Sequence, residues 1–276
     1  MTFCNIAKSF PSSPAEFPAN IQGAADSGFS WISNRFANGG VSFSDISIKD
    51  LSNLILSHLY WNYPQISFLY LQTLLLKQNE DGSFGDLRDT ARAVSSLSAA
   101  YSYFESRAPE FDNTSVLSAR GKAVHKILEQ RKFWDGPDSN LYDTVYVLSA
   151  LADAGVFEEE VCLDLIENDA ADRQHPGTTA LILTALQKQK NLEHFNEVAD
   201  FSIFEFISEK SKWLLSVCEN GNWKYTATSN LVLQAFVLCN QKHEAQRSLP
   251  WLLDSQNENG SWENDLNTTS LSLLTL

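Results

Sequence analysis

Two aspartates, each followed by a threonine, are the residues of this chain with the clearest chemical potential. Asp89-Thr90 and Asp143-Thr144 each stand at the start of a stretch whose apolar residues have helical spacing. A carboxylate in that position caps a helix by accepting hydrogen bonds from its first backbone N–H groups, and capping is the plainest expectation for both. Arg92 follows Asp89 by one helical turn. It could form an ion pair with either aspartate or bind an anionic group of a substrate.

Aromatic residues could form the walls of a binding site near these charges. Their rings present a negative π face to a cation, such as a carbocation formed during a reaction. Aromatic side chains at helical spacing more often pack in a protein core. The candidates are Tyr60, Trp61, Tyr142, Tyr146 and Phe236.

The cysteines and histidines do not form a metal-binding pattern. Cys4, Cys162, Cys218 and Cys239 lie far apart, without a C-x-x-C pair and without a histidine at ligand spacing. We therefore expect reduced thiols, no metal site and no cofactor.

Length and charge narrow the class of protein. A chain of 276 residues with 43% apolar residues can form one large domain. Its 20 basic and 34 acidic residues give a net charge of −14, which opposes binding to nucleic acid or to an anionic membrane. Its apolar runs are far shorter than a transmembrane helix needs. The first residues also lack the pattern of a secretory signal, so we expect a cytoplasmic protein without an integral membrane segment.

The chain contains internal repeats. Residues 78–84 and 256–262 share the pattern Gln-Asn-x-x-Gly-Ser-aromatic, and each follows one apolar helical stretch and precedes a second. Weaker copies bring the number of units to six. The second stretch of each unit is expected to start near Ser52, Thr90, Thr144, Thr179, Ser229 and Thr269.

The pattern of each repeat predicts a hairpin of two helices. A single hairpin cannot bury its apolar face, so the six copies must cover one another. The second helices carry hardly any charge, which favours a closed ring in which they form an inner layer. We expect an all-α protein with an N-terminal extension over residues 1–24 and a single domain over residues 25–276.

The repeated Gln-x-x-x-Gly-x-aromatic element, followed by a helix that starts with threonine, resembles a known superfamily. It is similar to the QW repeat of terpenoid cyclases of the squalene-hopene type and to the repeat of protein prenyltransferase β-subunits. This resemblance covers nearly the whole chain and implies an α6–α6 toroid of six hairpins around a central cavity. It also implies that the Gln and Trp of the motif tie neighbouring hairpins together.

The resemblance also suggests a catalytic acid. Terpenoid cyclases of this type protonate their substrate with an Asp-x-Asp-Asp-Thr element, in which the middle Asp is the acid. Residues 140–144 align with it as Asn-Leu-Tyr-Asp-Thr, and residues 86–90 align as Asp-Leu-Arg-Asp-Thr, so Tyr142 and Arg88 replace the acid. Asp143 or Asp89 is then the expected proton donor.

A comparison with the prenyltransferase β-subunits gives a different expectation for the same helix. Residues 141–151 are similar to the family's Tyr-His-Thr-x-Tyr-x-Leu-Ser-Gly-Leu helix, but Asp143 stands where the zinc-binding histidine would be. The chain also lacks an Asp-x-Cys to supply the other ligands. A zinc-dependent prenyltransferase is therefore not expected.

These observations favour a terpenoid cyclase-like enzyme, an isomerase or lyase, that acts on an apolar, isoprenoid-like substrate. Its expected substrate-binding residues are Tyr142, Tyr146, Arg92, Trp61 and Phe236. Two alternatives remain open: a non-catalytic toroid that binds a peptide or protein partner, and a zinc-independent prenyltransferase-like protein. A carbohydrate-active barrel would need paired carboxylates, for which Asp89 and Asp143 are the candidates.

Overall fold

The computed structural model describes residues 17–108, 111, 113–136, 139–167, 175–192 and 195–276. Across these ranges the protein is all-α, with twelve α-helices, one 3₁₀ turn and no β-strand. The α-helices are α1 (Ala19–Ala37), α2 (Ile48–Tyr60), α3 (Pro64–Leu75), α4 (Leu87–Arg107), α5 (Thr114–Glu129), α6 (Leu141–Asp153), α7 (Glu159–Glu167), α8 (Pro176–Lys190), α9 (Glu197–Ser216), α10 (Thr226–Leu238), α11 (Lys242–Asp254) and α12 (Leu266–Thr275). Helix α1 begins at Ala19 and so includes the last residues of the expected extension 1–24.

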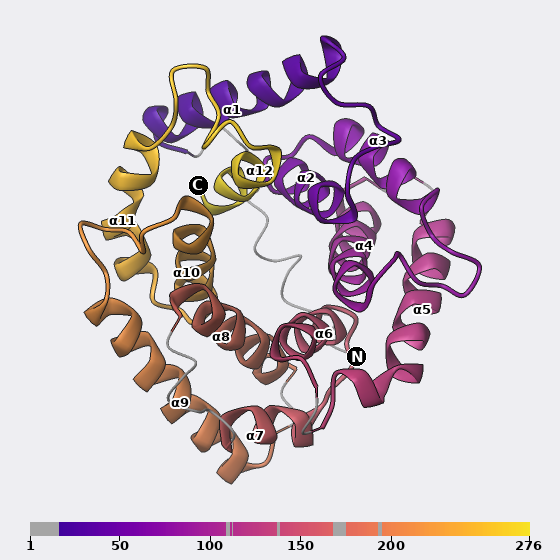
Figure 1. Ribbon diagram of the computed structural model, residues 1–276, viewed down its shortest axis with the longest axis vertical. Helices are drawn as coiled ribbons and strands as arrows, with labels where there is room; N and C mark the ends of the chain where they lie inside the picture. The colour runs from indigo at the N-terminus through magenta and orange to yellow at the C-terminus, as the bar shows by residue number, and fades with distance from the viewer. Residues whose placement is uncertain (1–16, 109–110, 112, 137–138, 168–174, 193–194) are drawn as a thin grey trace.

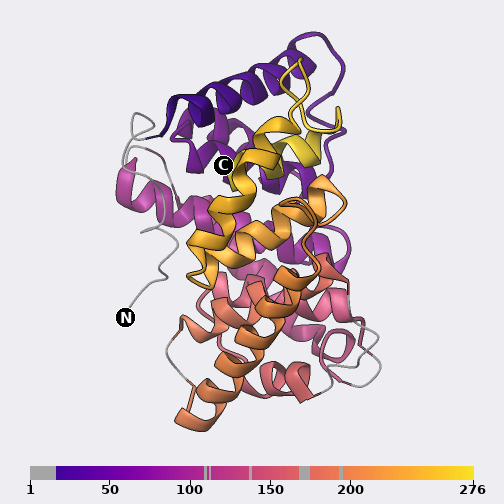
Figure 2. The same ribbon diagram turned by 90° about the vertical axis from the view of Figure 1, so that its left-hand side faces the viewer.

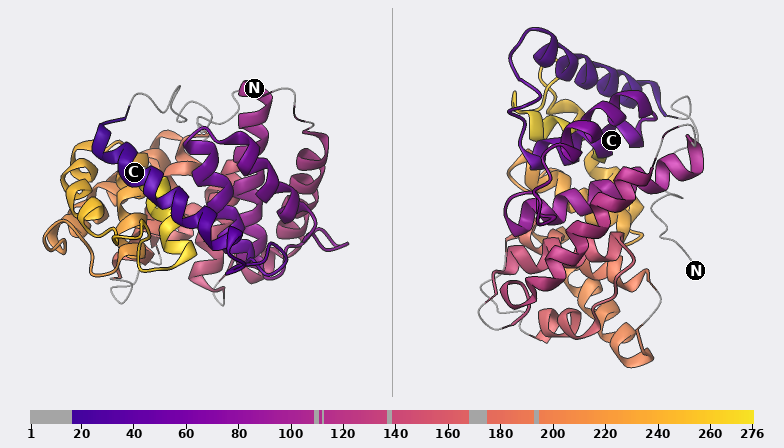
Figure 3. Two further views of the ribbon diagram at one scale, coloured as in Figure 1. Left: turned by 90° about the horizontal axis from the view of Figure 1, so that it is seen from above. Right: turned by 90° about the vertical axis from the view of Figure 1, so that its right-hand side faces the viewer.

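The helices form two layers. In Figure 1 the even-numbered helices α2 to α12 lie inside, and the odd-numbered helices lie around them. Each inner helix contacts the next one along the chain, and α12 also contacts α2. The side views in Figures 2 and 3 place α1 at one end of the long axis of the molecule and α9 at the other. These contacts leave one side of each inner helix turned away from the outer layer.

The inner helices run parallel to one another. Between α4 and α6, Arg88 contacts Asp143 and, one turn further along both helices, Arg92 contacts Tyr146. In four other pairs of inner helices, two hydrogen bonds show the same direction: the bond that lies further along one helix also lies further along its neighbour. These pairs are α2 with α4, α6 with α8, α10 with α12, and α2 with α12. The N-terminal ends of these helices therefore lie at the same end of the layer.

The caps of the inner helices differ from the sequence-based expectation. Asp86 caps α4 by accepting from the backbone N–H of Asp89, and Asn140 caps α6 by accepting from that of Tyr142. The prediction that Asp89 and Asp143 are the capping residues is therefore wrong. Each helix begins two residues before its predicted cap, so both carboxylates lie within the first turn. Their side chains are thereby available for contacts between helices.

The repeated turns connect neighbouring units through hydrogen bonds to backbone carbonyls. Gln78 Nε2 donates to Gly82 O in its own turn, at 3.0 Å, and to Ala119 O in α5, at 2.8 Å. Gln256 repeats this arrangement, because its Nε2 donates to Gly260 O and to Ala24 O in α1, each at 2.8 Å. The second link joins the turn between α11 and α12 to α1.

The tryptophans of two of the turns fix the turn to the hairpin's own two helices. Trp262 Nε1 donates to Leu252 O in α11 at 2.9 Å, and the Trp262 backbone N–H donates to Thr269 Oγ1 in α12 at 3.0 Å. Trp223 makes the equivalent pair of contacts with Leu214 O and Ser229 Oγ. The threonine or serine in the first turn of the inner helix therefore has a structural role.

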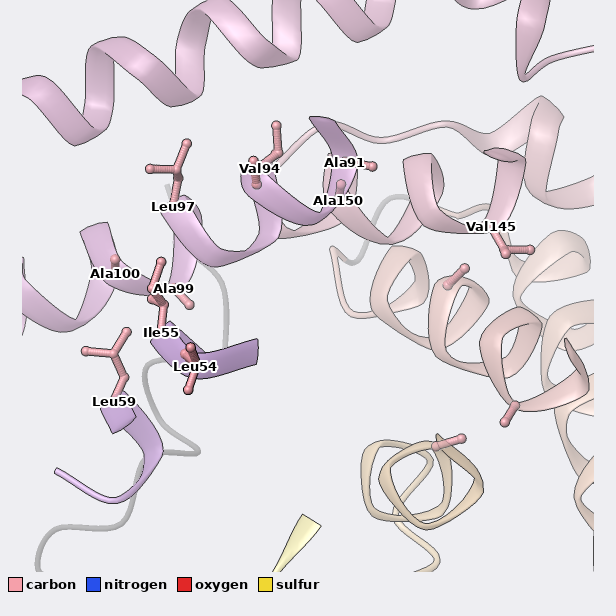
Figure 4. Close-up of a cluster of buried hydrophobic side chains, with 14 of the residues drawn as sticks. Leu54, Ile55, Leu59, Ala91, Val94, Leu97, Ala99, Ala100, Val145 and Ala150 are labelled. Carbon is pink, nitrogen blue, oxygen red and sulfur yellow. The ribbon is translucent and has the colours of Figure 1, made fainter. Parts of the chain in front are cut away.

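Small and branched apolar residues fill the space between the layers. Figure 4 shows part of this core, where residues of α2, α4 and α6 come together. Alanines let parallel inner helices approach closely, while leucines and isoleucines fill the gaps. The buried residues labelled there are Leu54, Ile55, Leu59, Ala91, Val94, Leu97, Ala99, Ala100, Val145 and Ala150.

None of the described helices is long and apolar enough to cross a bilayer.

Glycine is required where the first and last units meet. Gly260 has φ = +90°, and a Cβ built on it would lie 2.3 Å from Ser27 O of α1. Gly155 has a similar φ of +82° but has nothing within 4 Å of that position. Gly155→Ala should cost about 1–2 kcal/mol of unfolding free energy through backbone strain alone. Gly260→Ala should cost about 1–3 kcal/mol more, because α1 must also move.

Urea unfolding of the wild type and the two glycine variants tests this prediction. Equal losses of stability in Gly260→Ala and Gly155→Ala would contradict a tight contact between the last turn and α1.

A buried histidine makes the stability of the fold depend on pH. His58 in α2 is surrounded by Phe29, Tyr63 and Tyr70, and its Nδ1–H donates to Leu54 O at 2.8 Å. Burial lowers the pKa of His58 from 6.5 to about 4, although the hydrogen bond to Leu54 opposes this shift. Between these two pH values the unfolded chain binds a proton that the folded chain does not, so the native state loses stability as the pH falls.

The non-titrating variant His58→Gln isolates this effect. Between pH 7.5 and 4.5 the wild type should lose about 2–3 kcal/mol more unfolding free energy than the variant, as measured by urea unfolding. Carboxylates titrate alike in both proteins and cancel in the difference. Parallel pH profiles for the two proteins would show that His58 is not the responsible group.

Candidate functional site

Charged side chains meet at the N-terminal ends of α4 and α6. Arg88 Nε lies 2.7 Å from Asp143 Oδ1, which joins the two helices, and Arg92 Nη1 lies 2.8 Å from Asp89 Oδ1 within α4. All four side chains are partly exposed, at 21–39%. They therefore form a hydrated cluster of two ion pairs and do not belong to the closed core.

Arg92 also lies over an aromatic ring. Its guanidinium carbon is 4.5 Å from the centre of the Tyr146 ring on α6. Burial would lower the pKa of Arg92, but the interactions with Tyr146 and Asp89 outweigh it and the pKa is raised. The guanidinium is thus held as a fixed positive charge between α4 and α6.

Helix α8 extends this cluster through a hydroxyl pair. The Tyr142 hydroxyl lies 3.0 Å from Thr178 Oγ1 at the start of α8. Tyr142 is 42% exposed, so part of its side chain is accessible to a ligand. The structure therefore brings together five predicted site residues, namely Asp89, Arg92, Tyr142, Asp143 and Tyr146.

Two predicted binding residues lie elsewhere. Trp61 follows α2 at its C-terminal end, is fully buried and donates from Nε1 to Leu273 O at 2.7 Å. Phe236 in α10 is also fully buried and packs edge-on against Trp223, with ring centres 5.8 Å apart. Both side chains are in the core and do not join the cluster of Asp89 and Asp143.

A further ion pair was missed in the sequence. Asp153, at the end of α6, is 2% exposed at its side chain and lies 2.7 Å from Lys188 Nζ of α8. Its second carboxylate oxygen, Oδ1, is buried without a hydrogen-bond partner. Helical spacing could have indicated Asp153 as a site residue. It follows Tyr146 by seven residues, and Tyr146 follows Asp143 by three, so all three lie on one face of α6.

The described residues contain no group of three or more histidine, cysteine, aspartate or glutamate side chains that could hold a metal ion. Cys162, Cys218 and Cys239 are free thiols, whereas Cys4 lies outside the described residues. Burial raises the pKa of both Cys162 and Cys239 to about 12, which makes these thiols poor nucleophiles at neutral pH.

The cluster offers a defined set of chemical groups. Asp89 accepts a hydrogen bond from Arg92, Asp143 is ion-paired with Arg88, Tyr142 supplies a hydroxyl, and Tyr146 supplies a ring already covered by Arg92. Such a cluster can bind a polar or anionic group and can exchange protons at a carboxylate or phenol.

No protein-family model matches this chain, and no curated protein matches it either.

The Arg88–Asp143 pair should make only a small contribution to stability. A double-mutant cycle with Arg88→Ala and Asp143→Ala should give a coupling of about 0.5–1 kcal/mol, because water screens both partly exposed side chains. Arg247 and Glu244, a more exposed pair 3.4 Å apart on α11, should give a coupling near zero as the control. Urea unfolding measures both values, and no coupling between Arg88 and Asp143 would contradict the described contact.

Proposed function

We propose that the two helical layers form an α6–α6 toroid of the kind found in terpenoid cyclases and prenyltransferase β-subunits. Three observations support this proposal: the cyclic contacts of the inner helices, their parallel direction and the repeated glutamine contacts between units. The partly exposed side of the inner helices, on which the charged cluster lies, is then the inner wall of the ring.

We further propose that the chain is a terpenoid cyclase-like enzyme that binds an apolar, isoprenoid-like substrate against this wall. The observation that carries the proposal is the convergence of Asp89, Arg92, Tyr142, Asp143 and Tyr146 from two neighbouring helices. In this assignment a carboxyl of Asp143 or Asp89 gives its proton to one carbon of an alkene. The π electrons form the new C–H bond, and the adjacent carbon becomes a cation that a second alkene attacks to close a ring.

The ion pairs have a specific place in this reaction. As an acid, Asp143 must carry a proton, and its contact with Arg88 must be open. Once the proton has left, Arg88 is positioned to stabilise the carboxylate at 2.7 Å. The cyclic cation finally returns a proton to this carboxylate, so that the acid is regenerated and substrate and product are isomers.

The test combines ligand binding with product analysis. The wild type, Asp143→Asn and Asp89→Asn are incubated with polyprenyl alcohols, diphosphates and epoxides, followed by native mass spectrometry, thermal shift and analysis of extracted products. We expect one substrate class to stabilise all three proteins and product to fall at least 100-fold in the variant that lacks the acid. Asp254→Asn, which removes an exposed carboxylate on α11, is the control and should keep full activity.

A second candidate is a non-catalytic toroid that binds a peptide or protein. The observation that favours it is that both candidate acids are held in ion pairs with arginines. A zinc-independent prenyltransferase-like protein is tested in the same experiment by adding a peptide acceptor to the prenyl diphosphates. Absence of ligand response and of product with every compound would rule out the cyclase proposal and leave the binding protein.

A further inference from the structure

The outer surface of α9 exposes large apolar side chains. Val198, Phe201 and Phe204 are 77, 58 and 59% exposed, respectively. Phe201, Phe204 and Ser208 follow one another at steps of three and four residues, so they lie along one edge of the helix. This edge can receive the apolar side of another helix.

A groove lies beside Phe204 and Ser208 of this edge. It has a volume of about 450 Å³ and lies between α9 and the C-terminal ends of α8 and α10. Phe204, Ile207 and Leu238 form its apolar walls. Lys190 also lines the groove, but its charge is paired with Asp200. Gln187, Asn191, Asn240 and Gln241 also line it, so the groove is close to neutral and has both apolar and polar walls.

Acidic residues border the apolar edge of α9, since Glu205 follows Phe201 by four residues. Glu205 and Glu209 are exposed, one helical turn apart, and neither has an ion-pair partner within the described part of the chain. Like charges at this spacing repel each other. Helix α7 contacts α9 and adds the exposed Glu160 and Glu167. In Figure 1 both helices lie together at one end of the long axis.

We propose that this surface, defined by Val198, Phe201, Phe204, Glu205 and Glu209 and called the α9 face, docks a basic amphipathic helix of a partner protein. The partner's apolar residues would contact Phe201 and Phe204 and enter the groove, while its lysines or arginines would neutralise Glu205 and Glu209. The net charge of −14 disfavours a second copy of this chain or an anionic lipid surface as the occupant. The proposal is independent of whether the inner cluster is catalytic.

Two synthetic helical peptides test the α9 face. Both carry leucine at positions i, i+3, i+4 and i+7, and their remaining positions are lysine in one peptide and glutamate in the other. Fluorescence anisotropy in ~0.15 M salt measures binding to the full chain. The lysine peptide should bind the wild type, and Phe201→Ser/Phe204→Ser should weaken it at least tenfold. Glu205→Lys/Glu209→Lys should weaken the lysine peptide and gain affinity for the glutamate peptide.

Matched variants control for general effects of apolar area and charge. Leu69→Ser/Leu76→Ser removes two exposed leucines from the α3 region, and Glu80→Lys/Glu258→Lys makes the same change in net charge elsewhere. Both should bind the lysine peptide like the wild type, and thermal unfolding should show that every variant is folded.

Three results would overturn the proposal. The first is equal affinity of the lysine peptide for all variants, which would show attraction by net charge alone. The second is no binding to the wild type. The third is a dimer, detected by size-exclusion chromatography with light scattering, that Phe201→Ser/Phe204→Ser dissociates; the α9 face would then bind a second copy.

Discussion

The hydrogen bond from a turn glutamine to a backbone carbonyl of the next outer helix is the interaction on which the arrangement of the hairpins depends. Gln78 makes it to α5 and Gln256 makes it to α1, and in both cases the same amide also braces its own turn. The carbonyl that accepts this bond already accepts a backbone hydrogen bond within its own helix. The glutamine bond therefore sets the position of the turn on that helix more than it adds to the stability of the protein. Glycine in the turn is the accompanying requirement, since Gly82 and Gly260 have carbonyls of the next outer helix at 2.7 and 2.3 Å from where a Cβ would be.

Much of this fold is visible in the sequence because the turns repeat both their residues and their contacts. The Gln-Asn-x-x-Gly-Ser-aromatic pattern appears as two nearly superimposable sets of bonds, including Asn79 to Ser83 and Asn257 to Ser261. Helix starts were less predictable. Asp86 and Asn140 compete with the Asp-Thr pairs as caps, and sequence alone does not tell which polar residue has the extended backbone of a cap.

The candidate site was predictable only where its residues lie near one another in sequence. Asp89 with Arg92, and Asp143 with Tyr146, share a helix face, so periodicity relates them. The approach of Arg88 to Asp143 and of Lys188 to Asp153 depends instead on the parallel register of neighbouring helices. Trp61 and Phe236 lie outside this cluster, and their spacing gives no warning of it, because an aromatic residue at helical spacing fits a core as well as a binding wall. Both side chains are fully buried.

The bond between Gln256 and α1 also changes how the repeats cooperate. Linear arrays of hairpins fray, because a terminal unit has a neighbour on one side only and can detach without disturbing the others. Here the bonded residues are 232 positions apart, whereas Gln78 and Ala119 are 41 apart. The long-range link, with the contacts of α12 to α1 and α2, gives the first and last described units a second neighbour. Contacts thus link the first and last units among the described residues, which favours their unfolding together over peeling from either side.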